Sequence, residues 1–592
     1  MISKSIFTST STLNPFLNAL IREWGGWQFV KGGIADAVFG PDATVLRLDV
    51  TASGAVALIE TPHRSKVGYH DFAPPIYLTS NSGEPRPIDL ATLLAMLLRE
   101  PSIRGHATEM SRLTFLRRAL ASIVAAGEIS AAHGKIRPFA DRDPDFVEAE
   151  SALRFGHAVH PTPMSRDEFT AADSRRFGHE YANGFSLRWW AVEHDLLAAE
   201  SVAAQDAVTM ASGLASGDAR LLDCAHQAPG KVLVPMHPWQ AVRLMEQEPV
   251  ERLFRAGRLI DLGLGGPQWR ATTSLRTIHS AEADWMLKFS LSLRLTNSRR
   301  IVEERECRRG LSVHRLVKGA LGDALRQRCP AMNVLGEPAW LGLRDAEGRL
   351  MTDTIVSFRE NPFKGADAPR AAVLGALCER HPGTTESHLS DLVRRIAGEE
   401  KCEAAEAATR WFGRFLKIAV EPFVIAFGAF GLLFGAHQQN LVLGLRGGWP
   451  HTLYFRDCQG TGYVREFLPS LRRHLPEAGQ PGDHVFPATE AAKLFGYYLI
   501  VNGVFAVISA LSAAGLADED DLLTALRRFL QDLSARPLID RSCIDYLLDA
   551  PALLAKGNFL IALQNINENT EVTDPLAGYV DLPNPLLVRE YA

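Results

Sequence analysis

The pattern of apolar and polar residues changes several times along the chain. Residues 11–35 have the spacing of a helix followed by a glycine-rich turn. Residues 44–50 and 55–60 then alternate on either side of a short turn, which predicts a hairpin. Leucine, methionine and alanine recur at three- and four-residue steps over residues 90–126 and again over 145–155, as in helices that face a core. The N-terminal region is therefore predicted to be a small sheet with a helical bundle.

The middle of the chain favours strands and then helices. Residues 232–234 are an apolar run that ends at a proline, which predicts a buried strand with His237 at its end. Residues 272–277 and 288–300 carry Ser, Thr and Leu at alternate positions, and they predict two adjacent strands joined by a short connection. Residues 305–410 are predicted to be mostly helical.

Two apolar runs, residues 418–436 and 494–516, approach the length of a membrane span. The first contains a Glu-Pro pair, and the second contains an asparagine and is followed by four acidic residues. Neither is an uninterrupted stretch of about 20 apolar residues. Both are predicted to be buried helices of a large domain, and no membrane partner is expected. Between them, residues 441–455 predict a hairpin around two glycines.

Composition narrows the class of protein. With 592 residues the chain is long enough for three or four domains. Hydrophobic residues make up 46% and charged residues 22%, as in ordinary globular proteins. The net charge of -5 is spread along the chain, which argues against nucleic-acid binding. The seven cysteines form no CxxC pair and the first residues lack a secretory apolar segment, so a cytoplasmic location is predicted.

The first apolar run closes on four consecutive polar residues, His437, Gln438, Gln439 and Asn440. Such side chains at the edge of a core offer hydrogen-bond donors and metal-binding oxygen atoms, as in many ligand sites. The alternative is a helix end whose last carbonyl groups are satisfied by amide side chains. Asp457 follows at the end of the predicted hairpin, and with the amide oxygens it would complete the few protein ligands that a phosphate-bound Mg²⁺ needs.

A loop with two histidines, His157 and His160, lies before Pro161. Proline ends any helix and no third ligand follows nearby, so a zinc site is not predicted. Imidazoles held on a loop can instead hydrogen-bond an anionic substrate. The alternative is that the two histidines only close a turn.

Cations and hydroxyl groups alternate along the two predicted central strands. Ser274, Arg276 and Lys288 fall on related faces, with Thr296 and Arg300 near the far end. This mixture suits a polyphosphate, because lysine supplies a point charge, arginine a fork and serine or threonine a short donor. The alternative is an exposed strand whose polar face meets water. The sequence contains no Walker A, kinase, nucleophile-elbow or HExxH motif, so any nucleotide is expected to bind without a P-loop.

Six short motifs occur in order along nearly the whole chain. They are GHAVHP at 156–161, HPWQ at 237–240, TTSLRT at 272–277, KFSLSLRLTNSRR at 288–300, AHQQN at 436–440 and Arg-Asp at 456–457. In this order they resemble the NRPS-independent siderophore synthetases of the IucA/IucC, or aerobactin-synthetase, family. Each motif alone is weak, whereas six in family order are specific.

The resemblance implies an α+β fold shaped like a cupped hand, with antiparallel sheets and helical bundles. A thumb would cover residues 1–165, fingers with the phosphate-binding strands 166–390, and a mostly helical palm 391–592. It also implies a homodimer.

The resemblance further implies a ligase that uses ATP and Mg²⁺. A carboxylate of citrate, or of a related polycarboxylate, attacks the α-phosphate of ATP, and an amine, hydroxylamine or alcohol then takes the acyl group. The residues implied for ATP binding are Ser274, Arg276, Thr277, Lys288, Arg300, His437 and Asn440. The implied metal ligands are Gln439, Asn440 and Asp457, and the residues facing the carboxylate substrate are His160, Thr296 and Arg300. Lys288, Arg300 and His437 would be catalytic.

Two positions depart from the family pattern. Gly435 stands where the family often has glutamate, and Met164 where its loop often has lysine. Either change would mark a subclass with a different carboxylate, for instance a preformed citryl monoamide instead of free citrate. Two other function classes stay open: an ATP-dependent phosphotransferase that releases ADP, and a non-catalytic carboxylate-binding protein.

Overall fold

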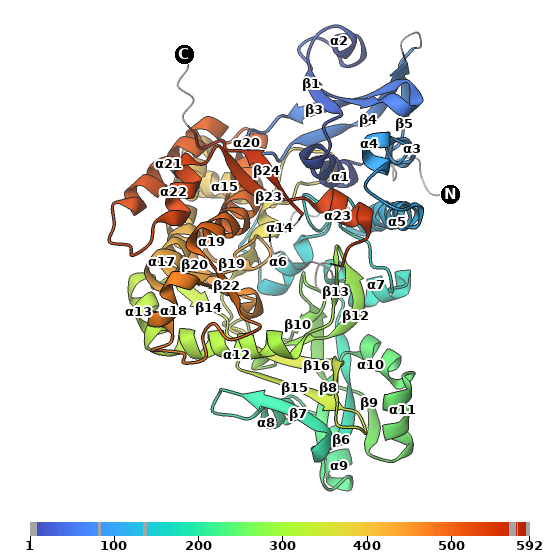
Figure 1. Ribbon diagram of the computed structural model, residues 1–592, viewed down its shortest axis with the longest axis vertical. Coiled ribbons are helices and arrows are strands. Elements are labelled where there is room, and N and C mark those ends of the chain that lie inside the picture. Colours follow the sequence, from blue (N-terminus) through green and yellow to red (C-terminus); the bar gives the residue numbers. More distant parts are fainter. Residues whose placement is uncertain (1–8, 81–83, 134–138, 568–575, 577, 588–592) are drawn as a thin grey trace.

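The computed structural model describes residues 9–80, 84–133, 139–567, 576 and 578–587 (Figure 1). Helix α1 (Thr10–Glu23) packs on a five-stranded antiparallel sheet whose strands lie in sequence order. The predicted hairpin is confirmed as its second and third strands. The strands are β1 (Trp27–Val30), β2 (Val45–Val50), β3 (Ala55–His63), β4 (Asp71–Ser80) and β5 (Arg86–Ile88).

Helices complete the N-terminal region, and all but the first of them lie where the spacing predicted helices. They are α2 (Ile34–Phe39), α3 (Leu90–Leu97), α4 (Pro101–Arg104), α5 (Glu109–His133) and α6 (Phe146–Ala152). Helix α6 begins at a capping box, since Asp145 Oδ1 accepts from Glu148 N over 2.9 Å and Glu148 Oε2 accepts from Asp145 N over 3.0 Å. This cap fixes the start of the helix and hence the position of Glu150.

An eight-stranded antiparallel sheet occupies the lower part of Figure 1, in the order β7-β15-β16-β11-β10-β9-β6-β8. Its strands are β6 (Phe185–Glu193), β7 (Leu197–Ser201), β8 (Lys231–Met236), β9 (Leu259–Ala271), β10 (Thr277–His279), β11 (Trp285–Phe289), β15 (Ala339–Arg344) and β16 (Leu350–Glu360). Nearby helices are α7 (Ala171–Phe177), α8 (Ala207–Gly213), α9 (Ala219–Gln227), α10 (Pro238–Met245) and α11 (Glu248–Arg255). Trp189, Trp190 and Trp269 are fully buried in its core.

The strand predicted over residues 272–277 is wrong for most of its length. Residues 272–276 form the turn between β9 and β10, because hydroxyl side chains hydrogen-bond the local backbone there. Thr272 Oγ1 donates to Thr277 O over 2.9 Å, and Ser274 Oγ accepts from Thr277 N over 3.2 Å. Thr277 does begin β10, where it pairs with Lys288 of β11.

Residues 288–300 are likewise not one strand. β11 ends at Phe289, and β12 (Leu291–Leu295) and β13 (Ser298–Arg300) form a separate two-stranded hairpin. Thr296 has a φ of 50° at the turn between them, a left-handed conformation that the alternation of side chains does not predict.

The prediction that residues 305–410 are mostly helical holds at both ends of this stretch but is wrong for residues 332–373. These residues contain β15, β16 and two short strands, Met332–Val334 and Ala371–Val373, and most of β15 and the second half of β16 are buried on both faces. A strand buried on both faces has a continuous apolar run without alternation, so its sequence does not separate it from a buried helix.

The C-terminal region combines helices with small sheets. The four-stranded sheet, in the order β14-β20-β19-β17, contains β14 (Met332–Val334), β17 (Ala371–Val373), β19 (Leu441–Arg446) and β20 (Trp449–Phe455), so the hairpin predicted over 441–455 is confirmed. Smaller sheets contain β18 (Leu432–Leu433), β21 (Gly462–Val464) and β22 (His484–Phe486), and β23 (Ala552–Lys556) with β24 (Tyr579–Pro583).

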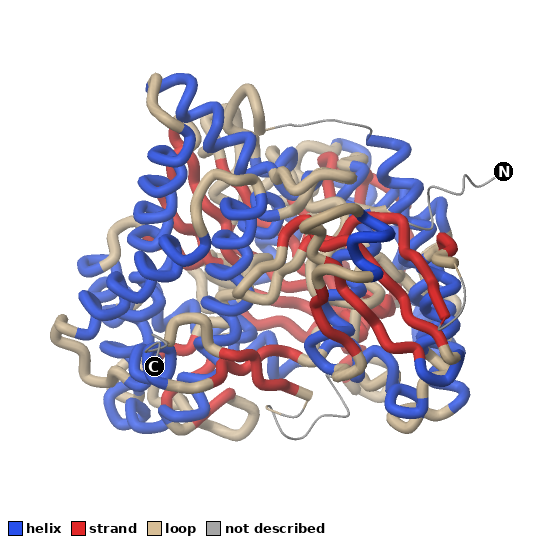
Figure 2. Tube along the Cα trace, turned by 90° about the horizontal axis from the view of Figure 1, so that it is seen from above, coloured by secondary structure: helices blue, strands red, loops and turns tan. Residues whose placement is uncertain are grey.

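The helices of the middle and C-terminal regions follow. They are α12 (Glu304–Lys318), α13 (Ala320–Arg328), α14 (Leu374–Cys378), α15 (His388–Glu400), α16 (Ala404–Phe415), α17 (Glu421–Phe430), α18 (Leu468–Leu471), α19 (Ala488–Phe495), α20 (Phe505–Ala513), α21 (Glu519–Ser534), α22 (Ser542–Asp549) and α23 (Asn558–Gln564). Figure 2 shows long helices gathered at one side and strands through the middle and the other side, as expected of the predicted α+β class.

Both apolar runs contain buried helices, as predicted. The second belongs to a continuous helical stretch, Ala488–Ala513, that is long and apolar enough to cross a membrane, but 94% of its most apolar window is buried in the protein. Residues Gly496–Val504 of this stretch form a wider π-helical segment. The C-terminal end returns to the N-terminal region, where Phe559 of α23 lies against Phe16 and Phe115. The boundaries of the three regions stay a prediction.

The HPWQ motif belongs to the core of the eight-stranded sheet. β8 continues through Pro235 to Met236, which is possible because β8 is the edge strand of the sheet. His237 then precedes α10 and packs against the rings of Phe177 and Phe185, with centroids 5.1 and 5.3 Å away. Burial lowers the pKa of His237 to about 3, so the imidazole is neutral in the fold.

We predict that replacing His237 by phenylalanine makes stability less dependent on pH. The folded pKa of His237 is depressed, so the stability of its neutral form is fully present above pH about 6.5 and is lost as the pH falls towards 3. Between pH 7.5 and 5.5 the wild type should lose about 1 kcal/mol more unfolding free energy than His237→Phe. Urea denaturation followed by tryptophan fluorescence measures the difference, and equal losses would contradict it.

Candidate active site

Segments from distant parts of the chain line one cavity of about 340 Å³. It lies where the loop after α6, the turn before β10, the β12–β13 hairpin and the segment between β18 and β19 meet. Every site residue predicted from the sequence lines this cavity. These residues are His160, Ser274, Arg276, Thr277, Lys288, Thr296, Arg300, His437, Gln439, Asn440 and Asp457.

A buried ion pair joins three of these segments. Arg456 Nη1 donates to Glu150 Oε1 over 2.7 Å, and both side chains are almost completely buried. Glu150 Oε2 accepts from the backbone N–H of Thr273 over 2.7 Å. Arg456 Nη2 donates to Thr273 Oγ1 over 3.0 Å and to the carbonyl oxygen of Gln439 over 2.8 Å. One pair of charges therefore fixes α6, the turn before β10 and the segment that carries Gln439.

Lys288 lies in a second buried network. Its Nζ donates to Asp457 Oδ1 and, over 2.6 Å, to Gln459 Oε1. Arg359 Nε donates to Glu337 Oε1 over 2.9 Å, and Arg359 Nη2 lies 3.5 Å from Asp457 Oδ1. The cations on this wall of the cavity are thus compensated by two carboxylates.

Asp457 is both ionised and conformationally constrained. Burial alone would raise the pKa of its carboxyl group, but Lys288, Arg359 and Arg276 outweigh burial and hold the pKa below its ordinary value. Its φ of 78° lies in the left-handed region, and Leu275 on the same cavity has a φ of 61°. Strained backbone of this kind persists where the surroundings hold it, and it gathers at functional sites.

The segment before Asn440 is not a helix end, so that alternative does not hold. Helix α17 already ends at Phe430, and the segment joins β18 to β19. Gln439 Nε2 donates to Thr273 O and Asn440 Nδ2 to Gly435 O, each over 3.0 Å. The side-chain oxygens of Gln439 and Asn440 accept no hydrogen bond from the described residues. Both oxygens are therefore available to a ligand. Two amide oxygens and a carboxylate beside cations fit the donor set of a phosphate-bound Mg²⁺.

The histidines at the cavity are neutral groups. Burial lowers the pKa of His437 to about 4 and of His157 to about 3, and it holds the pKa of His160 well below its ordinary value. His160 Nδ1 accepts from Thr162 N over 3.1 Å, so Nε2 carries the proton and donates to Asn297 Oδ1 over 3.1 Å. His160 therefore closes a turn and lines the cavity, and a hydrogen bond from it to an anionic substrate stays a prediction.

The β12–β13 hairpin brings Thr296 and Arg300 together, with 3.5 Å between Arg300 Nη2 and Thr296 Oγ1. Arg118 of α5 donates to the carbonyl oxygen of Thr296 and so holds the turn of the hairpin. Arg294 alternates with these residues in sequence but does not line the cavity, because its Nη1 donates to Asn565 Oδ1 over 2.7 Å.

Comparison with known proteins decides the family. Residues 145–379 match the IucA / IucC family model, and residues 409–571 match a model described as ferric iron reductase FhuF-like transporter. The chain is 33% identical to the rhizobactin siderophore biosynthesis protein RhbC of Rhizobium meliloti, covering 98% of each chain, and 30% identical to N(2)-citryl-N(6)-acetyl-N(6)-hydroxylysine synthase of Vibrio mimicus, covering 98% of this chain and 96% of that protein. ATP-bound aerobactin synthetase IucA of Klebsiella pneumoniae superposes with a TM-score of 0.89 at 31% identity, over 98% of this chain and 100% of the other.

The chain belongs to the IucA / IucC family of siderophore synthetases. It is therefore an enzyme of siderophore biosynthesis that ligates an acid and an amine. The resemblance drawn from the six sequence motifs is confirmed.

The sequence missed several groups at the site of this synthetase. Glu337 lies just before β15 and Arg359 lies in β16, within a stretch predicted to be helical, so the side of the chain on which each lies was not recognised. Glu150 lies in a predicted helix, where a single glutamate gives no signal of burial. Lys556 ends strand β23 and lines the cavity, and a cation at a strand end was a usable signal.

The two departures from the family pattern have different surroundings. A Cβ atom on Gly435 would meet the carbonyl oxygen of Gly460 at 3.7 Å, an ordinary contact, and Gly435 does not have a positive φ. Neither backbone strain nor close packing of that atom therefore requires glycine at this position. Met164 is buried in a small cluster with Phe155 and Ile129, so an apolar side chain fills its place at the rim.

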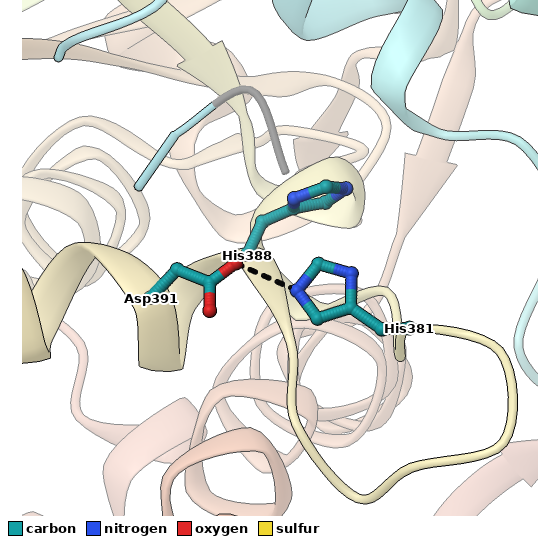
Figure 3. A group of neighbouring side chains, drawn as sticks. All are labelled: His381, His388 and Asp391. Atoms are coloured by element: carbon teal, nitrogen blue, oxygen red, sulfur yellow. Dashed lines mark hydrogen bonds and ion pairs between the residues drawn. The ribbon is translucent and has the colours of Figure 1, made fainter. Parts of the chain in front are cut away.

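A second group of possible ligands lies outside the cavity (Figure 3). His381, His388 and Asp391 are buried, and one donor atom of each lies within 4.8 Å of the others. Asp391 Oδ2 already accepts from His381 Nε2 over 2.7 Å, and a metal ion would have to replace that bond. The geometry favours a structural clamp that fixes the loop after Arg380 on helix α15.

We predict that Glu150→Gln destabilises the synthetase by about 3–5 kcal/mol, because it leaves Arg456 buried without a charged partner. Denaturant unfolding measures the loss. The double variant Glu150→Gln with Arg456→Met should lose less than the sum of the single variants. Additive losses would show that the ion pair does not couple the two segments.

Proposed function

We propose that the synthetase uses ATP to adenylate a carboxylate of citrate or a related polycarboxylate and joins the acyl group to an amine, hydroxylamine or alcohol, releasing AMP and pyrophosphate. The observation that carries this proposal is the convergence of all the predicted phosphate, metal and carboxylate residues on one cavity. Relatives named as a spermidine-citrate ligase of Bacillus anthracis and an L-2,3-diaminopropanoate-citrate ligase of Staphylococcus aureus support citrate and amine substrates, and the ATP-bound relative supports ATP.

The proposed triphosphate site combines charge with short donors. Lys288 and Arg276 offset the charge of the phosphates, while Ser274 and Thr277 offer hydroxyl groups from the turn and from β10. His437 is neutral and acts as a hydrogen-bonding group in this role. Because these groups are held before ATP binds, little reorganisation is needed as charge builds up on the attacked phosphorus.

Arg300 is placed to serve both reactants. It lies beside Thr296, on the hairpin that also faces His160 through Asn297. In the proposal, Thr296 and the guanidinium group of Arg300 bind the carboxylate of the acid. The same guanidinium group offsets the repulsion between this carboxylate and the α-phosphate. Bringing two anions together in this way supplies the proximity that the adenylation step requires.

Gln439, Asn440 and Asp457 would hold Mg²⁺, which when bound offsets phosphate charge. In the structure Asp457 contacts Lys288. A metal-bound triphosphate would give both groups new partners of the opposite charge, so the exchange leaves no buried charge uncompensated.

The proposed setting is a cytoplasmic homodimer with the three regions given above. The seven cysteines of the synthetase are free, which supports a reducing compartment. The dimer is supported by family resemblance, and size-exclusion chromatography with light scattering tests it.

The nucleotide product tests the proposed reaction. With ATP, Mg²⁺ and citrate, α-³²P-labelled AMP and pyrophosphate should form, and hydroxylamine should trap the activated acyl group. ADP would instead identify a phosphotransferase, and the absence of turnover with citrate, citryl monoamides, α-ketoglutarate and succinate derivatives would identify a carboxylate-binding protein.

We predict that Lys288→Ala lowers kcat/KM by about 2–4 kcal/mol of transition-state stabilisation, as for other losses of a preorganised charge contact. Acid-dependent ATP–pyrophosphate exchange measures it at saturating and subsaturating ATP. Arg294→Ala, which removes a cation of the same segment outside the cavity, is the matched control. Near-wild-type exchange in a folded Lys288→Ala variant would remove Lys288 from the site.

We predict that Asp457→Asn raises the Mg²⁺ concentration needed for half-maximal exchange, because a neutral oxygen replaces a charged one. A Mg²⁺ titration at fixed ATP measures the shift, with the melting temperature as a control for folding. If the Mg²⁺ dependence is unchanged while activity falls, Asp457 serves as the partner of Lys288 and not as a metal ligand.

A further inference from the structure

A second cavity, here called the side chamber, lies beside the active site. Its volume is about 80 Å³, several times what one water molecule needs. Four residues line both cavities, namely Leu153, Gly156, Gly375 and Gln438. The side chamber therefore adjoins the active site at the loop after α6 and at the AHQQN segment.

The wall of the side chamber is amphipathic. Apolar groups of Pro15, Phe155 and Ala506 alternate with polar ones around it. Asp71 and Arg380 also line it but satisfy each other, with 3.2 Å from Arg380 Nε to each carboxylate oxygen. Arg380 Nη2 additionally donates to Ser509 Oγ over 2.9 Å.

Glu379 is the carboxylate of the wall that has no side-chain cation bonded to it in the described residues. Its two oxygens accept from the backbone N–H groups of Arg154 and Phe155, each over 2.8 Å. Burial raises the pKa of Glu379 to about 8, although these hydrogen bonds and the nearby charge of Arg154 lower it. Because Glu379 lines the side chamber and no described cation is bonded to it, a cation in the chamber would have this carboxyl group as its partner and would favour its ionised form.

Gln438 supplies a second indication of a ligand. The residue is 9% exposed, and its amide group makes no hydrogen bond to the described residues, although its backbone N–H donates to Asn502 Oδ1 over 3.0 Å. The amide therefore has donors and an acceptor available to a ligand. Because Gln438 lines both cavities, this amide lies where the two cavities adjoin.

We propose that the side chamber holds the acceptor of the acyl group, and that this acceptor is an amine with a second, cationic nitrogen on a short aliphatic chain. Glu379 binds the cationic end, Gln438 hydrogen-bonds the chain at the opening, and the nucleophilic nitrogen lies in the active site. The nitrogen forms a C–N bond to the acyl carbon, the C–O bond to AMP breaks, and the nitrogen loses a proton to solvent. This inference rests on the proposed function, which supplies the activated acyl group.

Glu379→Gln tests the cationic end, with Glu23→Gln as the matched control. Glu23 is also a buried carboxyl group that accepts from two backbone N–H groups, at 2.6 and 2.8 Å, but it lines neither cavity. Wild type should transfer the acyl group to 1,5-diaminopentane about tenfold more efficiently than to pentylamine, the scale of a hydrogen bond to a charged group. Glu379→Gln should abolish this preference, and Glu23→Gln should keep it.

Two readouts separate this inference from the reaction itself. ATP–pyrophosphate exchange and acyl transfer to hydroxylamine need no side chamber. Glu379 also holds the loop after α6, so any loss of these two activities in Glu379→Gln should affect 1,5-diaminopentane and pentylamine equally, and the loss of preference between the amines should come in addition to it. Parallel loss of exchange and amine transfer, with the preference between the amines kept, would assign Glu379 to the active site and overturn the inference. If wild type shows no exchange with any acid, the proposed function fails, and saturation-transfer NMR of 1,5-diaminopentane on the two variants still decides whether the side chamber binds it.

The junction of the two cavities is tested by Gly375→Ala. The added Cβ would lie 3.4 Å from Leu153 Cδ2 and 3.7 Å from Gln438 Cγ, contacts that the fold tolerates, and it would add volume to the wall that both cavities share. Gly503→Ala is the control, because its Cβ would meet Leu374 and Leu441 at 3.7 and 3.8 Å and Gly503 itself lines neither cavity. Gly375→Ala should lower transfer to 1,5-diaminopentane about tenfold relative to hydroxylamine, on the scale of one misplaced contact. Equal effects of the two alanine variants would overturn the inference.

Discussion

The active site depends on burying charges in compensated pairs. Glu150 with Arg456, and Glu337 with Arg359, are both nearly inaccessible to solvent. A charge at such depth is tolerated only when an opposite charge and further hydrogen bonds satisfy it. Because the partners come from segments far apart in the chain, this requirement holds the segments together. None of them can shift without leaving a charge unsatisfied.

The same requirement explains how a site rich in cations is stable before any substrate arrives. Lys288 is almost fully buried, and Asp457 compensates its charge. Phosphate oxygens bear the same sign of charge as this carboxylate, so the proposed nucleotide replaces one anionic partner by another. The neutral state of His437 fits this balance, because a protonated imidazole would add a positive charge near Lys556, Arg456 and Arg300.

The site residues that belong to short sequence motifs could be predicted from the sequence. His160, Lys288, Arg300 and Asp457 were all placed at one site from such motifs, and the cavity contains all of them. Their backbone setting was not predictable. Alternation over 272–277 suggested a strand, whereas local hydrogen bonds of hydroxyl groups make a turn there, and Leu275 within this turn has a positive φ.

Residues whose role is to position others were hidden for a different reason. Glu150 and Arg359 have no characteristic spacing, because their partners are supplied by the fold and not by neighbours in sequence. The sequence therefore indicated neither the burial of these charges nor their partners.

The loop after α6 and the AHQQN segment carry two kinds of residue side by side. His160 and Gln439 face the active site, while Gly156 and Gln438 also line the side chamber. The side chain of Glu379 accepts a hydrogen bond from the backbone of the loop, and the side chain of Arg456 donates one to the backbone carbonyl of Gln439 in the segment. The two cavities therefore share rigid walls. In the proposed reaction these walls hold the activated acyl group and the acceptor next to each other without a large movement of the chain. The entropy of bringing the two reactants together is then lost on binding and not in the transfer step.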